Sequence, residues 1–452
     1  MRNVLLVEPD YKSKFPPLGL MRISTYHKQL GDKVVFKRGM SDEARALSWH
    51  KIYISSLFTY ELRRTVETAK YYQKSVESSK DIFIGGIGAT LMPHYVRANG
   101  DFSIIEGQID CPNKLEPGSP NLVTLLPDYD LLSCTEKRYT PSDAYFCRAT
   151  IGCIRKCTFC AVPKLEPKFR KLRSLSSQVK EIIKTFGEKQ DLIILDNNIL
   201  AWEQFDKIID EIKDLGFEKG SKRERRKRAV DFNQGLDARL LTEDKARLLS
   251  KICLKPVRLA FDTMAVEKHY RKAVIRLAKN GFYEFTNYLL FNCEDSPEDF
   301  FYRMSVNLEL SEELGIRVTG FPMKYSPVDS VVRRYISPKW KWKYLRGIQC
   351  VLLATHGMVS PNPEFFAAAF GNNYEEFLNI LSMPERYIIH RNAYKEEAKD
   401  WLREYKKLSE SERNALLDVL AEIVRTKNKI KVFRENKRFL HLLNYYYPDV
   451  KG

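Results

Sequence analysis

The stretch CIRKCTFC, residues 153–160, brings three cysteines together in one short segment. Cys153, Cys157 and Cys160 have the spacing CxxxCxxC, and Phe159 directly precedes the last of them. Three thiolates on so short a segment can bind three irons of a 4Fe–4S cluster and leave the fourth iron open to a small chelating ligand. A zinc site usually has four ligands in two pairs, and no second CxxC or histidine pair follows Cys160. The segment therefore predicts an iron–sulfur site with one open position.

This spacing, with an aromatic residue in this place, resembles the signature of the radical SAM superfamily. The resemblance implies that S-adenosylmethionine binds the open iron, with Phe159 beside the cofactors, and is reductively cleaved to a 5′-deoxyadenosyl radical that attacks an unactivated carbon. It also implies a flavodoxin- or ferredoxin-like reductant as a partner. The remaining cysteines are scattered, which favours small buried hydrophobic residues: Cys111, Cys134, Cys147, Cys253, Cys293 and Cys350.

A strand–helix rhythm that repeats six times surrounds the motif over residues 140–330. We expect strands at 145–151, 192–196, 230–234, 257–262, 284–291 and 316–323, with helices such as 202–215, 243–251 and 297–314. Six such units resemble the partial (βα)6 barrel of radical SAM enzymes. In barrels of this kind the chemistry lies at the carboxyl ends of the strands, and Cys153 directly follows the first strand.

Two further regions flank the expected barrel in this α/β chain. Residues 1–130 alternate short apolar strands (4–7, 33–36, 51–55, 81–84, 102–105) with helices (20–30, 61–79), which predicts a doubly wound parallel sheet. Residues 338–452 lose the strand pattern and read as a helical region, with helices at 340–356, 374–381, 395–408 and 411–425, the last without a full capping box. The chain has 452 residues and is 44% hydrophobic, enough for two or three domains with real cores.

The first region also resembles cobalamin-binding domains, which carry the motifs DxHxxG, SxL and GG. Ser55 and Leu57 fit SxL, and Gly85 and Gly86 fit GG. The segment after the first strand, EPDYKS at 8–13, has neither the cobalt-binding histidine nor the glycine. Two interpretations remain: a corrin bound without a histidine below the cobalt, or a domain that keeps the fold and has lost the cofactor.

Polar residues follow three of the expected barrel strands. By the same resemblance, Asp196 and Asn197 after the second strand hold the amino group of S-adenosylmethionine. Gln234 and Arg239 follow the third strand, and Arg239 could pair with the methionyl carboxylate. Asp262 ends the fourth strand and could reach the ribose hydroxyls. An ordinary strand-end cap is the alternative for each.

The formal net charge of +17 suggests a polyanionic partner such as nucleic acid. The basic run at 221–228 joins a helix to the next strand, so we expect a solvated loop on the face opposite the active site. The basic stretch 427–437 and the tyrosines at 445–447 are the better candidates for backbone contacts and stacking. No apolar run is long enough to span a bilayer and no signal peptide is recognisable, so we expect a cytoplasmic protein without a membrane partner.

These observations leave three functional hypotheses open. The first is a radical SAM enzyme that modifies an unactivated carbon, with methylation if cobalamin is bound. The second is a radical SAM enzyme that modifies nucleic acid and whose first domain is vestigial. The third is a non-catalytic iron–sulfur binding protein.

Overall fold

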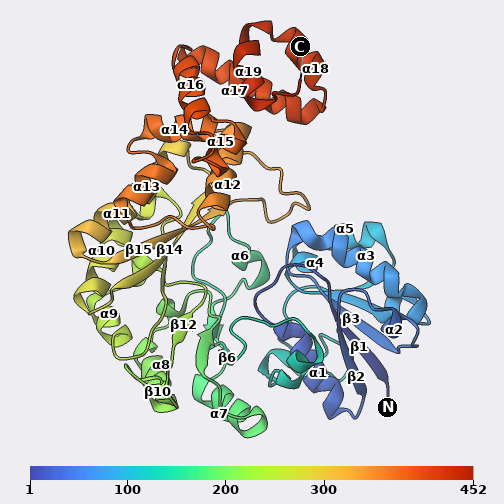
Figure 1. Ribbon diagram of the computed structural model, residues 1–452. Coiled ribbons are helices and arrows are strands. Elements are labelled where there is room, and N and C mark those ends of the chain that lie inside the picture. Colours follow the sequence, from blue (N-terminus) through green and yellow to red (C-terminus); the bar gives the residue numbers. More distant parts are fainter. Residues whose placement is uncertain (451–452) are drawn as a thin grey trace. The chain divides into compact units, whose positions relative to one another are not determined.

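The computed structural model describes residues 1–450 and divides the chain into two compact units (Figure 1). The first unit comprises Met1–Val257 and Ser326–Arg334, and the second comprises Arg258–Tyr325 and the chain from Tyr335 onward. Parallel sheets and a helical carboxyl-terminal part confirm the predicted α/β class. No helix within residues 1–450 is long and apolar enough to cross a membrane.

The first sheet has five parallel strands in the order β2-β1-β3-β4-β5. Each predicted strand of this region is present: β1 (Asn3–Glu8), β2 (Lys33–Arg38), β3 (Lys51–Ser55), β4 (Ile82–Gly85) and β5 (Ser103–Ile105). The strand order reverses between β1 and β3, and in open α/β sheets ligands bind at the carboxyl ends of strands at such a point. Residues 8–13 and 55–57 leave the sheet there.

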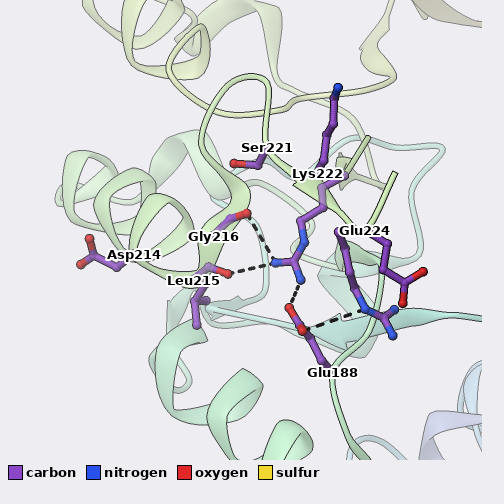
Figure 2. Close-up of a pocket in the computed structure, with 9 residues that line it drawn as sticks. Glu188, Asp214, Leu215, Gly216, Ser221, Lys222 and Glu224 are labelled. Carbon is purple, nitrogen blue, oxygen red and sulfur yellow. Dashed lines mark hydrogen bonds and ion pairs between the residues drawn. The ribbon is translucent and has the colours of Figure 1, made fainter. Parts of the chain in front are cut away.

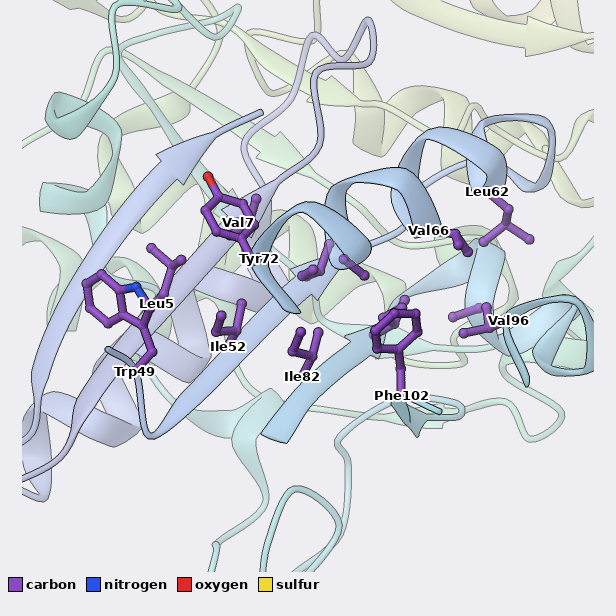
Figure 3. Packing of buried hydrophobic residues seen from close by; sticks show 14 of the residues in the cluster. Leu5, Val7, Trp49, Ile52, Leu62, Val66, Tyr72, Ile82, Val96 and Phe102 are labelled. Carbon is purple, nitrogen blue, oxygen red and sulfur yellow. The ribbon is translucent and has the colours of Figure 1, made fainter. Parts of the chain in front are cut away.

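Helices cover both faces of this sheet. Leu5, Val7, Ile52 and Ile82 alternate along their strands and pack under the helices that lie on one face (Figure 3). Those helices are α3 (Leu62–Tyr72), α4 (Ile87–Leu91) and α5 (Pro93–Asn99), and α1 (Leu18–Gln29) lies on the other face (Figure 1). The short α2 (Asp42–Arg45) follows β2. This core fixes the strand ends that carry the SxL and GG residues.

A second parallel sheet, in the order β12-β9-β6, precedes and follows the cysteine segment in sequence. Its strands are β6 (Ala144–Cys147), β9 (Asp191–Ile194) and β12 (Val230–Phe232), and its helices are α7 (Leu175–Phe186), α8 (Phe205–Ile212) and α9 (Glu243–Leu249). The strand predicted at 145–151 ends at Cys147, because the next amides turn away to bond Asp196. After that corner, β7 (Thr150–Ile151) pairs antiparallel with β8 (Arg170–Lys171).

The basic run at 221–228 is ordered differently from the solvated loop that we expected. Lys222–Arg223 (β10) and Arg226–Lys227 (β11) pair as a small antiparallel hairpin. The hairpin follows a π-helical turn at Lys213–Phe217, in which Gly216 takes a φ of 82°. It enters β12 directly, so it lies at the amino end of the second sheet.

The last three predicted barrel strands form a separate sheet in the order β13-β14-β15. These are β13 (Val257–Ala260), β14 (Glu284–Phe291) and β15 (Arg317–Lys324), connected by α10 (Glu267–Lys279) and α11 (Pro297–Leu314). The border between the two units falls between β12 and the rest of β13. A single six-stranded barrel, and the domain boundaries 1–130, 140–330 and 338–452, therefore stay predictions.

The carboxyl-terminal region is helical, as predicted. Its helices are α12 (Trp342–Ala354), α13 (Pro363–Phe370), α14 (Tyr374–Ser382), α15 (Glu385–Ile389), α16 (Lys395–Lys406), α17 (Glu410–Thr426), α18 (Lys429–Glu435) and α19 (Leu440–Tyr446). The expectation that α17 lacks a capping box was wrong: Ser409 caps the helix, and Glu412 bonds back to its amide. The tyrosines at 445–447 pack against a buried core around Trp401, so they are not the free stacking surface that we expected.

Candidate functional site

The cysteine segment begins at a glycine that is packed against its own loop. Gly152 has a φ of 82°, and a Cβ added there would lie 2.4 Å from the Lys168 carbonyl oxygen. Its amide donates to Glu166 at 2.7 Å. Only glycine combines this left-handed backbone with so close an approach. The start of the segment is therefore fixed by the backbone that follows α6 (Val162–Leu165).

Backbone amides donate to two of the three motif sulfurs. The Arg155 amide donates to Cys153 Sγ at 3.3 Å, and the Val162 amide donates to Cys160 Sγ at 3.5 Å. The Arg239 guanidinium lies beside Cys157. The three cysteines are half-exposed, so each is accessible from outside the core. Sulfur atoms surrounded by donors are suited to the thiolate state that binds iron.

The thiols do not converge on one point. Within residues 1–450, no three side chains of histidine, cysteine, aspartate or glutamate are grouped so that they could hold a single metal ion. A 4Fe–4S cluster does not require such a group, because each thiolate binds a different iron. The donor set fits a cluster with three protein ligands and gives no support to a mononuclear metal site.

Asp237 connects the cysteine segment to the loops after β9 and β12. Its carboxylate accepts from Arg155 Nε at 3.1 Å, from Asn198 Nδ2 at 3.1 Å and from Arg239 Nε at 2.7 Å. Burial by itself would raise the pKa of Asp237, but the two arginines outweigh it and the pKa is lowered. The carboxylate therefore stays ionised and holds the donors that surround Cys153 and Cys157.

Asn198 is a functional candidate that the sequence analysis missed. Its Nδ2 lies 3.5 Å from Cys153 Sγ, its side chain is buried, and its Oδ1 has no hydrogen-bond partner. An unpartnered buried amide oxygen next to a motif sulfur can accept a hydrogen bond from a ligand. The run of three polar residues after β9 was the available signal, but it did not single out the third position.

The structure uses Asp196 and Asn197, the predicted ligands of the amino group, for internal contacts. Asp196 accepts from the Ala149 amide at 3.0 Å and from Thr150 Oγ1 at 2.6 Å, and burial raises its pKa to about 6. Asn197 Nδ2 donates to Glu166 at 2.7 Å. Both residues thus brace the corner that leads into the cysteine segment, and their binding of a cofactor stays a prediction.

Glu166 is the second residue that the sequence analysis missed. It forms a bidentate pair with Arg148, at 2.8 and 2.6 Å, in addition to its bonds from Gly152 and Asn197. Burial would raise the pKa of Glu166, but these donors lower it. Gln108, in the linker after β5, also donates to Glu166. The carboxylate therefore ties the cysteine segment to the first domain.

The other predicted barrel residues lie in different settings. Phe159 is half-exposed within the segment, and Gln234 is exposed with its amide donating to Asn233 at 3.2 Å. Arg239 lies beside Cys157, but its guanidinium is held by Asp237. Asp262 belongs to the second unit, where its carbonyl accepts from Arg303. Cofactor contacts of these residues stay predictions.

The SxL and GG residues of the first domain pack against one another. A Cβ at Gly86, where φ is 99°, would lie 2.5 Å from the Ser56 carbonyl oxygen, and one at Gly85 would lie 3.3 Å from Ile105 Cβ. Ser55 Oγ shares a hydrogen bond with the Tyr11 hydroxyl at 3.1 Å, and Leu57 is half-buried. The approach of the Ser56 backbone therefore requires glycine at position 86, and Ile105 leaves little room for a side chain at position 85.

The strand ends at the switch point do not fit a corrin. Glu8 is buried and accepts from the Tyr139 hydroxyl, and Tyr11 is buried with its ring against Phe58. His94, the histidine that follows the GG turn, is exposed. Large side chains thus occupy the edge at which a flat cofactor would lie, so no chemical step is assigned to cobalamin.

No protein-family model matches the chain, and no protein of curated function matches it. Among solved structures it is similar to the cobalamin-dependent S-adenosylmethionine radical enzyme OxsB, with 15% identity and a TM-score of 0.37 over 86% of this chain and 56% of that chain. It is also similar to Streptococcus suis SuiB bound to S-adenosylmethionine, with 13% identity and a TM-score of 0.30 over 46% of this chain and 42% of that chain. For a structure of Streptococcus suis SuiB bound to the precursor peptide SuiA, the sequence identity is 13% and the TM-score is 0.32, over 65% of this chain and 63% of that chain. The chain thus spans less than two thirds of each of these proteins, and the similarities are weak.

Proposed function

We propose that this chain is a radical SAM enzyme. Cys153, Cys157 and Cys160 bind a 4Fe–4S cluster whose fourth iron is open to S-adenosylmethionine. The observation that carries the proposal is that the sulfurs of Cys153 and Cys160 accept hydrogen bonds from backbone amides, and that Asn198 and Arg239, which follow neighbouring strands, lie beside Cys153 and Cys157. A cluster of buried, inert cysteines would have neither the exposure nor these donors.

The residues of the chain have separate tasks in this proposal. A 4Fe–4S cluster held by Cys153, Cys157 and Cys160 would supply the one electron, taken from a flavodoxin- or ferredoxin-like reductant, that reductive cleavage of S-adenosylmethionine to methionine and a 5′-deoxyadenosyl radical requires. Asp237 keeps the Arg155 and Arg239 side chains in place beside the motif. Asn198 Oδ1 accepts a hydrogen bond from the amino group of the methionyl moiety, and Arg239 neutralises its carboxylate.

The state of the first domain supports the hypothesis of a lost cofactor. Methylation through cobalamin requires room for the corrin at the switch point, and Tyr11, Phe58 and Tyr139 occupy that edge. We therefore propose hydrogen abstraction from an unactivated carbon without a corrin. The non-catalytic alternative is less favoured, because a scaffold has no need for the unpartnered acceptor Asn198 Oδ1 beside Cys153.

The test is the formation of 5′-deoxyadenosine. The full chain, reconstituted with iron and sulfide under anaerobic conditions, is mixed with S-adenosylmethionine and dithionite, and the product is measured by mass spectrometry. Replacing any one motif cysteine, for example Cys157→Ala, should reduce product formation at least about a hundredfold, since each thiolate holds one iron. The exposed Cys134, outside the motif, supplies the matched control Cys134→Ala.

Product formation that survives Cys157→Ala would contradict the proposal, and so would loss of the activity in both variants. Iron bound in stoichiometric amounts without any cleavage would instead support the non-catalytic iron–sulfur protein.

A further inference from the structure

The hairpin formed by β10 and β11 is the most strongly basic feature of the first unit. It follows the π-helical turn and precedes β12, whereas the cysteine segment follows β6. Its base contacts the residues that start the strands: Gln190 Nε2 donates to the Lys227 carbonyl at 2.9 Å, and Arg223 pairs with Asp143 at 2.9 Å. The hairpin and the motif thus lie at opposite ends of one parallel sheet.

The cations of the hairpin fall into two groups. Arg228 is buried, pairs with Glu188, and donates to the carbonyl groups of Leu215 and Gly216. Together with Arg223 it anchors the hairpin. The other group is exposed and makes no ion pair within residues 1–450: Lys222, Arg225, Arg226 and Lys227.

The strand register places like charges opposite one another. In the antiparallel register, Lys222 lies opposite Lys227 and Arg223 lies opposite Arg226. Like charges directly opposite across an antiparallel pair are destabilising. The first residue of the turn, Glu224, also takes a left-handed φ of 55°, which is uncommon for a residue other than glycine. A bound polyanion would relieve this repulsion, since it would place negative charge between the paired cations.

A hollow of about 790 Å³ lies between the hairpin and the π-helical turn (Figure 2). In Figure 2 the Lys222 side chain points away from Glu188. Glu188, Asp214 and Glu224 line the hollow, so its walls carry both signs of charge. The hollow therefore lies at the base of the hairpin, which Arg223 and Arg228 anchor. Arg225, Arg226 and Lys227 do not line it and are available to a partner.

We propose that this hairpin binds the phosphate backbone of a nucleic acid. Two of the four available cations, Arg225 and Arg226, are arginines, whose planar guanidinium bonds phosphate in a bidentate manner. The run SKRERRKR contains no aromatic residue for stacking on bases and no apolar residue for insertion into a bilayer. The contact is thus electrostatic and independent of base sequence, and it docks the partner at the sheet end opposite the cysteine motif. This docking role stands whether or not the chain cleaves S-adenosylmethionine.

The sequence had favoured the basic stretch at 427–437 over this hairpin. In the second unit, however, Lys431 pairs with Glu435, and the Lys429 ammonium lies 4.7 Å from the centre of the Tyr447 ring. The tyrosines at 445–447 are packed against the helical core. The tail also has exposed cations that make no ion pair within residues 1–450, among them Lys427, Arg434 and Lys437. It has no free rings, however, and it lacks the direct cross-strand opposition of like charges found in the hairpin.

The test compares two triple variants with the same change in net charge. One is Arg225→Gln/Arg226→Gln/Lys227→Gln, and the other is Lys427→Gln/Lys429→Gln/Lys437→Gln. Binding of a fluorescent single-stranded RNA and of a DNA duplex to the full chain is measured between about 50 and 200 mM salt. The hairpin variant should bind at least about tenfold more weakly at low salt. For the single strand, the negative slope of log binding constant against log salt concentration should become shallower by about 2. The tail variant should stay within about twofold of the parent.

Circular dichroism of both variants shows whether the chain remains folded, and the hairpin double variant Arg225→Gln/Lys227→Gln gives a smaller perturbation with an intermediate expected effect. Equal losses in the two triple variants would overturn the proposal, since net charge alone would then explain binding. Binding that ignores salt would overturn it as well. Binding to vesicles of anionic lipid without binding to either nucleic acid would assign the hairpin to a membrane surface and overturn it too.

Discussion

At the scale of single residues, Gly152 decides how the cysteine segment begins. Its left-handed backbone and its 2.4 Å approach to the Lys168 carbonyl oxygen leave no room for a side chain. Asp237 and Glu166 then hold the segment through hydrogen bonds to seven residues: Arg155, Asn198 and Arg239 for the first, and Gln108, Arg148, Gly152 and Asn197 for the second. The motif is thus supported by ionised carboxylates rather than by hydrophobic packing.

Two glycine variants separate close approach from backbone strain. Gly152→Ala adds a clash to a strained φ, whereas Gly118→Ala adds only the strain, because nothing lies within 4 Å of a Cβ at Gly118 and its φ is also 82°. We expect about 1 kcal/mol of destabilisation for Gly118→Ala and about 3 kcal/mol or more for Gly152→Ala. Urea denaturation measures the stability, and the iron content after reconstitution should fall only in Gly152→Ala. Equal costs in the two variants would refute the role given to the Lys168 contact.

The sequence predicted the cysteine motif but not its supports, for a physical reason. The cysteines are recognisable because iron coordination imposes a fixed spacing. The role of Asp237 could not be recognised, because in the sequence it is indistinguishable from an ordinary N-cap, and its side chain does accept from the Arg239 amide. Glu166 gave no signal, because its partners come from four separate segments of the chain, residues 108, 148, 152 and 197. Long-range hydrogen bonds of this kind leave no periodicity in the sequence.

At the scale of secondary structure elements, local patterns were sufficient to place most strands. The predicted ranges 51–55 and 284–291 coincide with β3 and β14. The strand predicted at 145–151 was too long, because Asp196 draws the Ala149 and Thr150 amides out of the ladder. The run at 221–228 was predicted as a loop, because two-residue strands made of charged residues show no alternation of apolar and polar positions.

The linker after β5 is an element whose stability should depend on pH. Glu116 accepts from Arg2 and Tyr26, at 3.1 and 2.8 Å, and pairs with Lys51, so it clamps the linker to β1, α1 and β3. Burial by itself would raise the pKa of Glu116, but these donors lower it to about 2, below the ordinary value of 4.5. Because the pKa of Glu116 is lower in the folded than in the unfolded chain, its ionisation stabilises the fold at pH values above the unfolded-state pKa. This stabilisation is lost as the pH falls from about 4.5 to about 2.

We therefore expect Glu116→Gln to destabilise the chain by about 2 kcal/mol at pH 7 and by progressively less as the pH falls through this window. Urea denaturation at a series of pH values measures the difference. The matched control is Glu43→Gln, because Glu43 pairs with Lys37 on the surface and is 86% exposed. A difference in unfolding free energy between the parent and Glu116→Gln that does not change with pH would contradict the lowered pKa of Glu116.

At the scale of the whole molecule, the net charge of +17 indicated a polyanionic partner but not a location. Only the folded chain distinguishes cations that are already paired from those that are not. The hairpin keeps four unpaired cations on two short paired strands, whereas the unpaired cations of the tail lie on and next to α18 and its tyrosines are packed against the helical core. The first domain shows the same principle. Its motifs resemble those of cobalamin-binding domains, but Tyr11 and Phe58 pack together at the strand ends where the cofactor would lie.

We propose that the three motif thiolates hold a 4Fe–4S cluster with one open iron, and that the chain binds no corrin. The most direct measurement is made on the full chain purified without oxygen: the absorption spectrum and iron content, followed by electron spin resonance of the dithionite-reduced protein with and without S-adenosylmethionine. We expect about four irons per chain, no corrin absorption, and a cluster signal that changes when S-adenosylmethionine is added. A chain that binds zinc in place of iron, that copurifies with stoichiometric cobalamin, or whose cluster signal is unchanged by S-adenosylmethionine would contradict this proposal.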